Sequence, residues 1–456
     1  MAKKKLFGTD GIRGTANTFP VTPEIVIKVG QALGHVLKKK PIRKGDKRTV
    51  LIGKDTRLSG YMIEQAMAAG LNSMGVRVFL TGPLPTPGIG FVARNMRADA
   101  GVVISASHNA FQDNGIKLFG PDGFKLPAEM EAEIEDLVLN GDLSNHLADG
   151  NQIGRTRRID DAEGRYIVNA KNSLPMNKDL EGMRIVLDCA NGAAYKVAPA
   201  IFSELGAEVI VFGDKPNGRN INDEAGALHP HRTCEEVKKY RADVGITLDG
   251  DADRVIMVDE LGRIVNGDHI LAILGLHMKE QGVLKNDTIV ATQMSNIGLD
   301  RVLKENGIKI VRTDVGDKYV VEEMRKNDYN LGGEQSGHII NLDHSTTGDG
   351  CLAALNVLQV MQETGKKLSE LNDLMDDVPQ ILVNSRVKTR VPLDEVDGYP
   401  ELIDKIEKEL GDRGRVFVRF SGTEPVVRVL LEGLDRKRIA AYAEEIAAHL
   451  QSQLGK

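Results

Sequence analysis

The apolar runs Ile185-Val186-Leu187, Val209-Ile210-Val211 and Val244-Gly245-Ile246-Thr247 decide the fold class of this chain. Each run is short, uncharged and rich in Val and Ile, which is typical of a strand buried on both faces. A longer helical pattern at 197–205 separates the first run from the second. Strand, helix and strand at this spacing predict βαβ units, and therefore parallel or mixed sheets covered by helices.

The same alternation continues in both directions along the chain. Further strands are predicted at Val50-Leu51-Ile52, Val102-Val103-Ile104, Thr288-Ile289-Val290 and Ile308-Lys309-Ile310-Val311. Further helices are predicted at 24–37, 62–74, 270–279, 352–364 and 434–454.

Polar or turn-rich segments divide the chain into domains. The segment 140–154 is rich in Gly, Asn and Asp, the segment 259–267 has the pattern of a turn, and 371–379 follows a predicted helix. We therefore expect three α/β domains with mixed sheets and a smaller C-terminal α+β domain. The expected bounds are 1–155, 156–260, 261–373 and 374–456, in this order.

Composition excludes several classes of protein. The 456 residues are 41% hydrophobic and 27% charged, as in an ordinary globular protein of about three domains. Aromatic residues make up 4% and Trp is absent, which argues against binding single-stranded nucleic acid by stacking. The net charge of −6 argues against general DNA binding, so we expect no nucleic-acid partner.

Cysteine use and hydropathy indicate the compartment. Cys189, Cys234 and Cys351 lie far apart and form no C-x-x-C motif, which predicts buried free thiols in a reducing compartment. The basic N-terminus precedes no apolar segment of the signal-peptide kind, and no run of about 18 apolar residues occurs. We therefore expect a cytoplasmic protein with no membrane partner.

The most informative motif is Asp249-Gly250-Asp251-Ala252-Asp253-Arg254, directly after a predicted strand. Unscreened carboxylates about 4 Å apart repel by about 4 kcal/mol at an effective dielectric constant near 20. A divalent cation removes this repulsion, and ligands that are all oxygen atoms suit Mg²⁺. A solvated acidic turn is the alternative. An EF-hand does not fit, because Arg254 stands where that loop needs Gly and the flanks are β-like.

A second motif, Ser105-Ala106-Ser107-His108-Asn109, follows the strand predicted at Val102-Val103-Ile104. A serine at the tip of a strand beside a histidine is a candidate nucleophile, although a turn held by local hydrogen bonds is the alternative. No G-x-S-x-G elbow surrounds it. Nearby Lys117 can take a hydroxyl proton if its pKa is lowered, or stabilise phosphoryl charge if it is not.

Two later loops have the composition of ligand-binding sites. Arg419-Phe420-Ser421-Gly422-Thr423-Glu424-Pro425, with Arg428 downstream, combines hydroxyls and guanidiniums as a phosphate cradle does; a surface turn is the alternative. Gly332-Gly333-Glu334-Gln335-Ser336-Gly337-His338 suits a hydroxyl-rich ligand such as a sugar, or is an ordinary loop. Gly8–Gly14 and Lys54-Asp55-Thr56-Arg57 can each add cationic donors.

Nucleotide-binding motifs are weak in this chain. The segments 88–93 and 348–353 match G-x-G-x-x-A, but prolines at 83, 85 and 87 precede the first where a strand is needed. The second lacks a convincing ribose-binding acid on a following strand. No G-x-x-x-x-G-K-[ST] sequence occurs, so a P-loop is not supported.

Five motifs, in this order over the full length, together resemble the α-D-phosphohexomutase family. They are Gly8-Thr9-Asp10-Gly11-Ile12-Arg13-Gly14, Ser105-Ala106-Ser107-His108-Asn109, Asp249-Gly250-Asp251-Ala252-Asp253-Arg254, Gly333-Glu334-Gln335-Ser336-Gly337-His338 and Arg419-Phe420-Ser421-Gly422-Thr423-Glu424-Pro425. The N-terminal string, Gln335 and Thr346-Thr347-Gly348-Asp349-Gly350 favour the glucosamine branch over the phosphomannomutase and phosphoglucomutase branches.

The resemblance implies four domains around a central cleft and a role for each motif. It implies a phosphorylated Ser107, and Mg²⁺ held by Asp249, Asp251, Asp253 and an oxygen on Ser107. Lys117 matches the proposed general acid/base, with His108 and Arg13 beside it in the catalytic set. The substrate contacts implied are Arg254, Glu334, Ser336, His338, Arg419, Ser421, Gly422, Thr423 and Arg428. One departure is Ala110, which stands where the family usually has Pro.

The resemblance also implies an activity. It implies interconversion of glucosamine 6-phosphate and glucosamine 1-phosphate through a phosphoserine enzyme and glucosamine 1,6-bisphosphate, feeding UDP-N-acetylglucosamine and cell-wall precursor synthesis. The implied partners are small sugar phosphates, and a homodimer is allowed. Open alternatives are a mannose or glucose phosphate mutase, a sugar-phosphate-binding regulatory module, and a phosphatase that releases phosphate.

Overall fold

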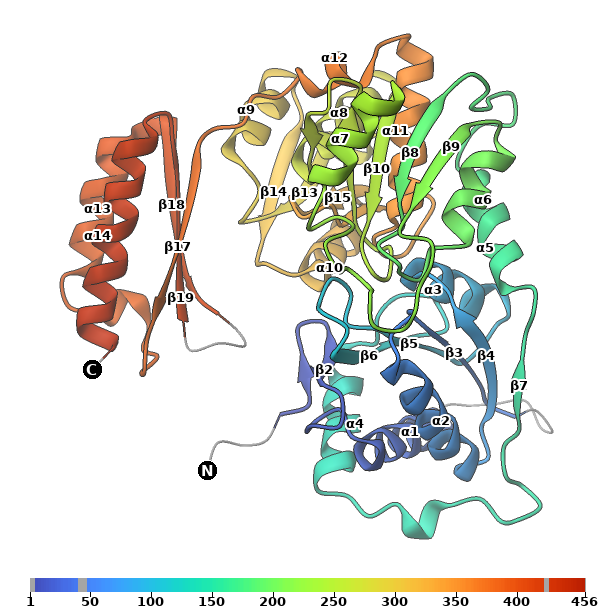
Figure 1. Ribbon diagram of the computed structural model, residues 1–456. Helices are drawn as coiled ribbons and strands as arrows, with labels where there is room; N and C mark the ends of the chain where they lie inside the picture. Colours follow the sequence, from blue (N-terminus) through green and yellow to red (C-terminus); the bar gives the residue numbers. More distant parts are fainter. Residues whose placement is uncertain (1–4, 40–46, 422–425, 456) are drawn as a thin grey trace.

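Four β-sheets, each with its own helices, follow one another along the chain in a computed structural model (Figure 1). The structure describes residues 5–39, 47–421 and 426–455. We call the sheets with their helices the first, second, third and fourth domains. The predicted fold class, three α/β domains followed by a smaller α+β domain, is confirmed.

The first domain contains a seven-stranded mixed sheet. Its strands are β1 (Phe7–Gly8), β2 (Gly11–Thr15), β3 (Thr49–Lys54), β4 (Arg77–Pro83), β5 (Ala100–Ile104), β6 (Asp113–Phe119) and β7 (Thr156–Arg158). Its helices are α1 (Pro23–Lys38), α2 (Ser59–Ser73), α3 (Thr86–Asn95) and α4 (Ala128–Leu139). The strand order is β1-β2-β6-β5-β3-β4-β7, so β7 extends this sheet past residue 155. β3 pairs in parallel with β4 and β5.

The second domain has a five-stranded sheet in the order β12-β11-β10-β8-β9. Its strands are β8 (Arg184–Asp188), β9 (Glu208–Phe212), β10 (Val244–Leu248), β11 (Val255–Asp259) and β12 (Ile264–Val265). Its helices are α5 (Ala162–Lys171), α6 (Val197–Glu204) and α7 (His231–Tyr240). β10 and β11 form a hairpin, with Leu248 opposite Val255, so the acidic motif forms its turn. The predicted turn at 259–267 contains β12, which belongs to this sheet.

The third domain has a four-stranded sheet in the order β14-β13-β15-β16. Its strands are β13 (Thr288–Thr292), β14 (Lys309–Thr313), β15 (Leu331–Gly333) and β16 (Ile339–Asn341). Its helices are α8 (Gly267–Glu280), α9 (Ile297–Glu305), α10 (Asp317–Asn327), α11 (Gly350–Thr364) and α12 (Leu368–Asn372). β15 and β16 pair antiparallel, so Glu334 and His338 lie in the loop that joins them.

The fourth domain is a three-stranded antiparallel sheet with two helices. Its elements are β17 (Gln380–Arg386), α13 (Tyr399–Leu410), β18 (Gly414–Phe420), β19 (Val426–Gly433) and α14 (Arg436–Leu454). β19 lies between the other two strands. Ile439, Ile446 and Leu450 are buried along one face of α14, as their helical spacing predicts.

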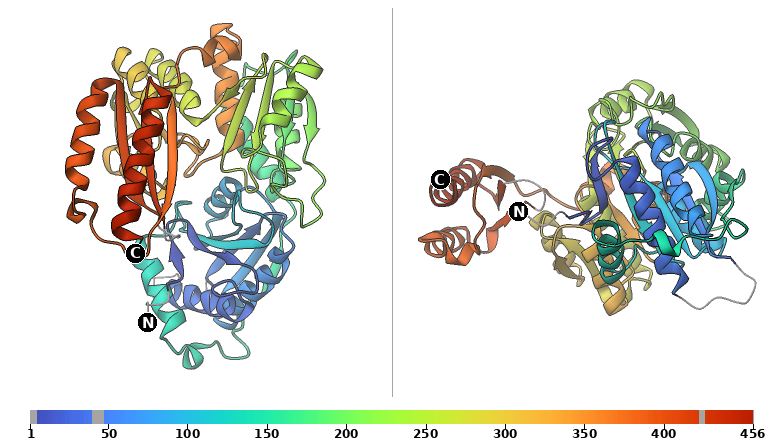
Figure 2. Two further views of the ribbon diagram at one scale, coloured as in Figure 1. Left: turned by 60° about the vertical axis from the view of Figure 1, so that its left-hand side comes forward. Right: turned by 90° about the horizontal axis from the view of Figure 1, so that it is seen from below.

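Burial separates the fourth domain from the rest of the protein. One continuous cluster of buried apolar side chains runs through the first three domains, from Leu51 to Met375. A separate cluster, from Val387 to Leu454, forms the core of the fourth domain. Figure 2 shows this domain, in red, standing to one side of the other three.

Several smaller predictions can be compared with the structure. The segment 88–93 follows β4, contrary to expectation, but its glycines are buried inside α3 and form no phosphate-binding turn at a helix N-terminus. Cys189 and Cys351 are buried free thiols as predicted, and Cys234 is a partly buried one. Among the described residues, no helix combines the length and hydropathy that a membrane-spanning segment needs.

Candidate active site

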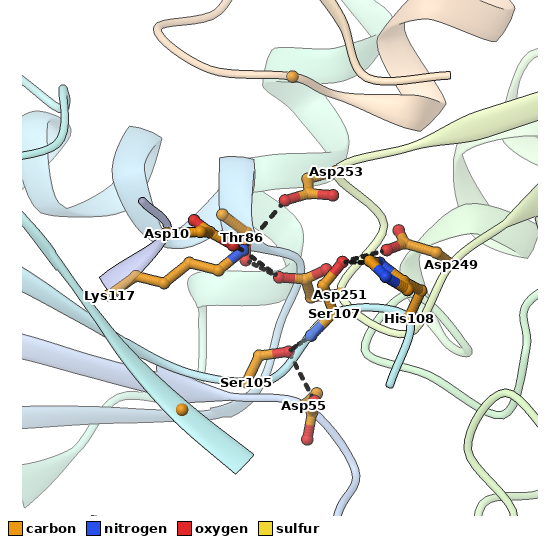
Figure 3. Close-up of polar contacts among 12 residues, drawn as sticks. Asp10, Asp55, Thr86, Ser105, Ser107, His108, Lys117, Asp249, Asp251 and Asp253 are labelled. Atoms are coloured by element: carbon orange, nitrogen blue, oxygen red, sulfur yellow. Dashed lines mark hydrogen bonds and ion pairs between the residues drawn. The ribbon is translucent and has the colours of Figure 1, made fainter. Parts of the chain in front are cut away.

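Ser107 lies at the buried start of the loop between β5 and β6, against the second domain. Its side chain is almost wholly buried, and its φ of 52° is in the left-handed region that non-glycine residues rarely adopt. The hydroxyl donates to Asp249 Oδ2 at 2.6 Å, and its Oγ lies 3.3 Å from His108 Nδ1 (Figure 3). The structure therefore brings together a serine and an acidic motif that are 142 residues apart.

The acidic motif forms a compact, buried cluster at the end of the β10–β11 hairpin. Asp249, Asp251 and Asp253 are at most 4% exposed, and one carboxylate oxygen from each lies within 4.8 Å of the others. Burial, together with repulsion from Asp253 and Asp251, raises the pKa of Asp249 well above its ordinary value. Three carboxylates packed this closely are unfavourable unless positive charge lies beside them.

The residues of this cluster fit a hard divalent cation. Asp251 Oδ1 and Asp253 Oδ1 are buried, yet accept no hydrogen bond from any described residue. Buried carboxylate oxygens without a hydrogen bond are costly, and a metal ion would satisfy them. The set consists only of oxygen donors, as Mg²⁺ prefers, and the Ser107 hydroxyl lies directly beside it.

Lys117 partly balances the charge of the acidic cluster. Its ammonium group donates to Asp251 Oδ2 at 2.9 Å and to Asp253 Oδ2 at 3.1 Å, and lies 3.3 Å from Asp10 Oδ2. Burial alone would lower the pKa of Lys117, but the attraction of these three carboxylates outweighs it and raises the pKa well above 10.5. In this arrangement Lys117 is a charged hydrogen-bond donor and not a free base.

Two arginines and two histidines surround the acidic cluster and affect its charge. Burial, followed by repulsion from Arg254 and Arg13, lowers the pKa of His108 to about 4, so its ring is neutral at pH 7. Arg13 forms an ion pair with Asp10, and Arg254 Nε lies 3.9 Å from Asp253 Oδ1. His338 Nδ1 lies 3.6 Å from the same Asp253 oxygen.

A cleft of about 800 Å³ opens beside this cluster and is lined by residues from all four domains. Of the sequence-predicted site residues, the cleft is lined by Arg13, Asp253, Arg254, Glu334, Ser336, His338, Arg419, Ser421 and Arg428. Glu334 and His338 are buried and Ser336 is exposed. Ser107, His108, Lys117, Asp249 and Asp251 lie outside this lining, in the packed region beside it.

On the fourth-domain side of the cleft, two guanidinium groups come together. Arg419 on β18 is directly opposite Arg428 on β19. Burial, followed by repulsion from Arg428, lowers the pKa of Arg419, whose buried Nε has no hydrogen-bond partner among the described residues. Like charges held opposite one another favour an anion between them. Gly422 and Thr423, also predicted here, lie outside the described residues.

The motif Lys54-Asp55-Thr56-Arg57 does not supply cationic donors to the cleft, contrary to the sequence-based expectation. Lys54 forms a buried ion pair with Glu64 at 2.8 Å, and its side chain is 1% exposed. Arg57 is completely buried, and its Nε donates to Asp55 Oδ2 at 2.7 Å. Both cations are therefore engaged inside the first domain.

Sequence reasoning missed several residues that support the site. Asp10 connects Lys117, Arg13 and Lys125, and Thr86 donates to Asp251 Oδ2 at 2.6 Å. Asp10 lies within the motif Gly8–Gly14, whose sequence predicts only a cationic donor. No sequence pattern indicates Thr86 as a site residue, because it follows a proline-rich turn and contacts Asp251 only through the packing of two domains.

The family models for phosphoglucomutase/phosphomannomutase match four consecutive parts of this chain. The α/β/α domains I, II and III match residues 4–145, 164–262 and 266–378, and the C-terminal domain matches residues 382–449. The solved structure of a phosphoglucomutase/phosphomannomutase family protein from Burkholderia thailandensis has a similar fold, with a TM-score of 0.79 at 22% identity, over 98% of this chain and 97% of that chain.

Curated relatives are similar over nearly the full length of this chain. The phosphoglucosamine mutase of Bdellovibrio bacteriovorus is 67% identical over 453 residues, and that of Geotalea daltonii is 56% identical over 452 residues. Each alignment covers 99% of both chains. With four matching domains in order and relatives this similar, the chain belongs to the phosphoglucomutase/phosphomannomutase family, the α-D-phosphohexomutases, and is an enzyme of the isomerase class.

Proposed function

We propose that this enzyme is a phosphoglucosamine mutase, which interconverts glucosamine 6-phosphate and glucosamine 1-phosphate. The observation that carries the proposal is the Ser107 hydroxyl, 2.6 Å from Asp249 in a buried acidic cluster beside the cleft. Relatives that are 67% and 56% identical bear this name, which favours amino-sugar phosphates as substrates. The product, glucosamine 1-phosphate, would feed the synthesis of UDP-N-acetylglucosamine and of cell-wall precursors.

The acidic cluster would hold Mg²⁺ through Asp249, Asp251, Asp253 and an oxygen on Ser107. When bound, the ion neutralises phosphoserine charge and stabilises the transferring phosphoryl group. Phosphoserine carries nearly two negative charges at pH 7, so a site of three carboxylates needs such compensation. Arg13 and Arg254 bring further positive charge to the same side of the cleft.

Ser107 carries the phosphoryl group and Lys117 handles the proton. The 1-hydroxyl oxygen of glucosamine 6-phosphate forms a bond to phosphorus while the bond from phosphorus to Ser107 Oγ breaks. The hydroxyl loses its proton and the serine oxygen gains one, so the atoms balance. Lys117, which is protonated, would donate its proton to Ser107 Oγ as that oxygen leaves phosphorus, and the neutral amine would then take the proton of the sugar 1-hydroxyl. Neutral His108, whose Nδ1 lies 3.3 Å from Ser107 Oγ, would orient that oxygen.

The far side of the cleft would bind the phosphate group that does not react. Arg419, Ser421 and Arg428, with Gly422 and Thr423, form the phosphate-binding loop of this proposal. Glu334, Ser336 and His338 contact the sugar hydroxyls. A loop that recognises only the distal phosphate accepts the 1,6-bisphosphate intermediate in both orientations, so the second transfer returns a phosphoryl group to Ser107. The intermediate must turn over within the closed site, away from water.

Intact-mass spectrometry combined with a turnover assay tests this function. The purified enzyme should carry one added phosphate, which glucosamine 6-phosphate removes as the bisphosphate forms. A substrate panel of glucosamine, glucose and mannose phosphates separates the amino-sugar mutase from the two related activities. Net release of inorganic phosphate would indicate a phosphatase, and binding without phosphate exchange would indicate a regulatory module. We further expect the enzyme to act in the cytoplasm on small sugar phosphates, as a monomer or homodimer.

A further inference from the structure

The loop that carries Ser107 contains two backbone carbonyls that the sheet does not pair. Among the described residues, the carbonyl oxygens of Ser107 and Asn109 accept no backbone N–H group. Buried carbonyl groups need donors, and the left-handed φ of Ser107 must be held by its surroundings. Side chains therefore have to fix this part of the loop.

Arg57 supplies donors from the first domain. Its Nη2 donates to Ser107 O at 2.7 Å and to Asn109 O at 2.8 Å, and its Nη1 donates to Asp113 O at 3.1 Å and to Ala110 O. Asp55 fixes the guanidinium by accepting from Nε, and it also accepts from Ser105 Oγ at 2.6 Å. One buried side chain thus binds carbonyls along the whole turn that follows Ser107.

Asn222 supplies donors to the same two carbonyls from the second domain. Its Nδ2 donates to Ser107 O at 2.9 Å and to Asn109 O at 3.1 Å. A carbonyl oxygen has two lone pairs and can accept from both domains at once. The Asn222 backbone is itself fixed, because its N–H donates to Ala190 O at 2.9 Å.

We propose that Arg57 and Asn222 are positioning residues that clamp the Ser107 loop from two domains. The second domain carries both Asn222 and Asp249, so this clamp holds the loop in register with the acidic cluster, with Ser107 Oγ 2.6 Å from Asp249. Neither residue lines the cleft. The clamp therefore governs the rate of phosphoryl transfer and not the binding of the sugar phosphate. This inference rests on the proposed function of Ser107.

Asn222→Asp is the most discriminating variant, because it exchanges a donor for an acceptor with almost no change in volume. The new carboxylate faces two carbonyl oxygens and repels them. We expect the single-turnover rate constant for transfer from the phosphoenzyme to glucosamine 6-phosphate to fall at least about tenfold. The KM should stay within about twofold. This rate constant counts only phosphorylated enzyme, so a smaller folded fraction does not change it.

Asn217→Asp is the matched control. Asn217 is exposed in the same segment of the second domain, and its side-chain oxygen accepts from the N–H groups of Arg219 and Asn220. Aspartate keeps these acceptors and adds the same charge away from Ser107. The control should therefore transfer phosphate at the wild-type rate.

Amide hydrogen exchange across residues 105–113 gives a second measurement that does not depend on catalysis. Exchange in this segment should be faster in Asn222→Asp, and also in Arg57→Lys, which keeps the charge beside Asp55 but loses the forked donors. Wild-type transfer and exchange in both variants would overturn the clamp. A wild-type enzyme that transfers no phosphate would reject the proposed function, while exchange in this segment would still decide whether the clamp exists.

Discussion

The two regions of this enzyme that we expect to handle phosphate groups are built in opposite ways. Ser107 is buried where the first two domains meet, and side chains from both of them hold its loop. Arg419 and Arg428 lie on a hairpin of the fourth domain, which has a core of its own. Under the proposed function, phosphoryl transfer needs a fixed geometry, whereas the bisphosphate intermediate has to bind in two orientations. The fold thus separates a fixed reacting group from an independently packed binding hairpin.

The fourth domain is nevertheless attached to the third by specific contacts. Glu432, whose side chain is 0% exposed, accepts from the N–H of Ile297 at 3.1 Å and pairs with Arg415 at 2.6 Å. Arg415 also donates to the carbonyl of Ser295 at 3.0 Å. These contacts lie at the N-terminal end of α9, so they fix where the binding hairpin is attached without merging the two cores.

The largest expected effect comes from removing the reacting group. Ser107→Ala should lower turnover by at least about 10⁴-fold and abolish the added phosphate, because no other hydroxyl faces Asp249 among the described contacts. Intact mass and turnover measure both effects. Ser105→Ala is the comparison: it loses the acceptor of the Ser107 N–H and the donor to Asp55 Oδ2 but keeps the Ser107 hydroxyl, so it should still become phosphorylated. Near-normal turnover of Ser107→Ala would show that Ser107 is not the nucleophile.

The next largest effect should come from the acidic cluster. Asp251→Asn removes one of three buried carboxylates and should reduce turnover about 10²–10³-fold, because charge stabilisation in the transition state is lost. The response of turnover to added Mg²⁺ should weaken together with the rate. Asp223→Asn, at an exposed position of the same domain, is the control. A variant with wild-type turnover and an unchanged Mg²⁺ response would contradict the metal assignment.

The binding hairpin should give a smaller effect of a different kind. Arg419→Ala should raise the KM for glucosamine 6-phosphate about 10–100-fold, because a charge-assisted contact to phosphate is lost. The phosphate on Ser107 should remain, since Ser107 lies in the first domain and Arg419 in the fourth. Steady-state kinetics and intact mass separate these two results, with Arg438→Ala on α14 as the control. If KM and kcat were both unchanged, Arg419 would not bind the distal phosphate.

The smallest effect should come from Ala110, where the family usually has Pro. The Ala110 N–H donates to no described backbone group, so Ala110→Pro should lose no hydrogen bond. We expect turnover within about twofold of wild type and slower amide exchange around residue 110. A tenfold loss of turnover would mean that the loop needs the conformation that alanine permits.

The sequence predicts the parts of this enzyme that depend on local patterns. Runs of Val and Ile predict the buried strands, because a sheet covered on both faces buries consecutive side chains, as in β10 and β13. The acidic motif is equally local, since a single hairpin turn brings its carboxylates together. The sequence presents the serine and the acidic motif as separate signals, and only the resemblance to a known family predicts that they lie together.

Contacts between distant segments explain what the sequence did not predict. Asn222 meets Ser107 across 115 residues, and Thr86 meets Asp251 across 165. Asn and Thr are common in loops and turns, so no sequence pattern marks Asn222 or Thr86 as a site residue. The motif at 54–57 presents Arg57 as one of the cationic donors available to a ligand. The buried Asp55 beside it reverses that inference, and only the packing shows that both side chains face inward.

The position of Lys117 has a consequence for how this protein is made. Its ammonium group already sits between two of the carboxylates that suit a metal ion. The newly synthesised polypeptide thus carries a tethered counter-ion, which offsets part of the repulsion among these carboxylates as the protein folds. Because Lys117 holds the Oδ2 atoms, while Asp251 Oδ1 and Asp253 Oδ1 accept no hydrogen bond from a described residue, the proposed ion would meet these two oxygens without displacing the amine.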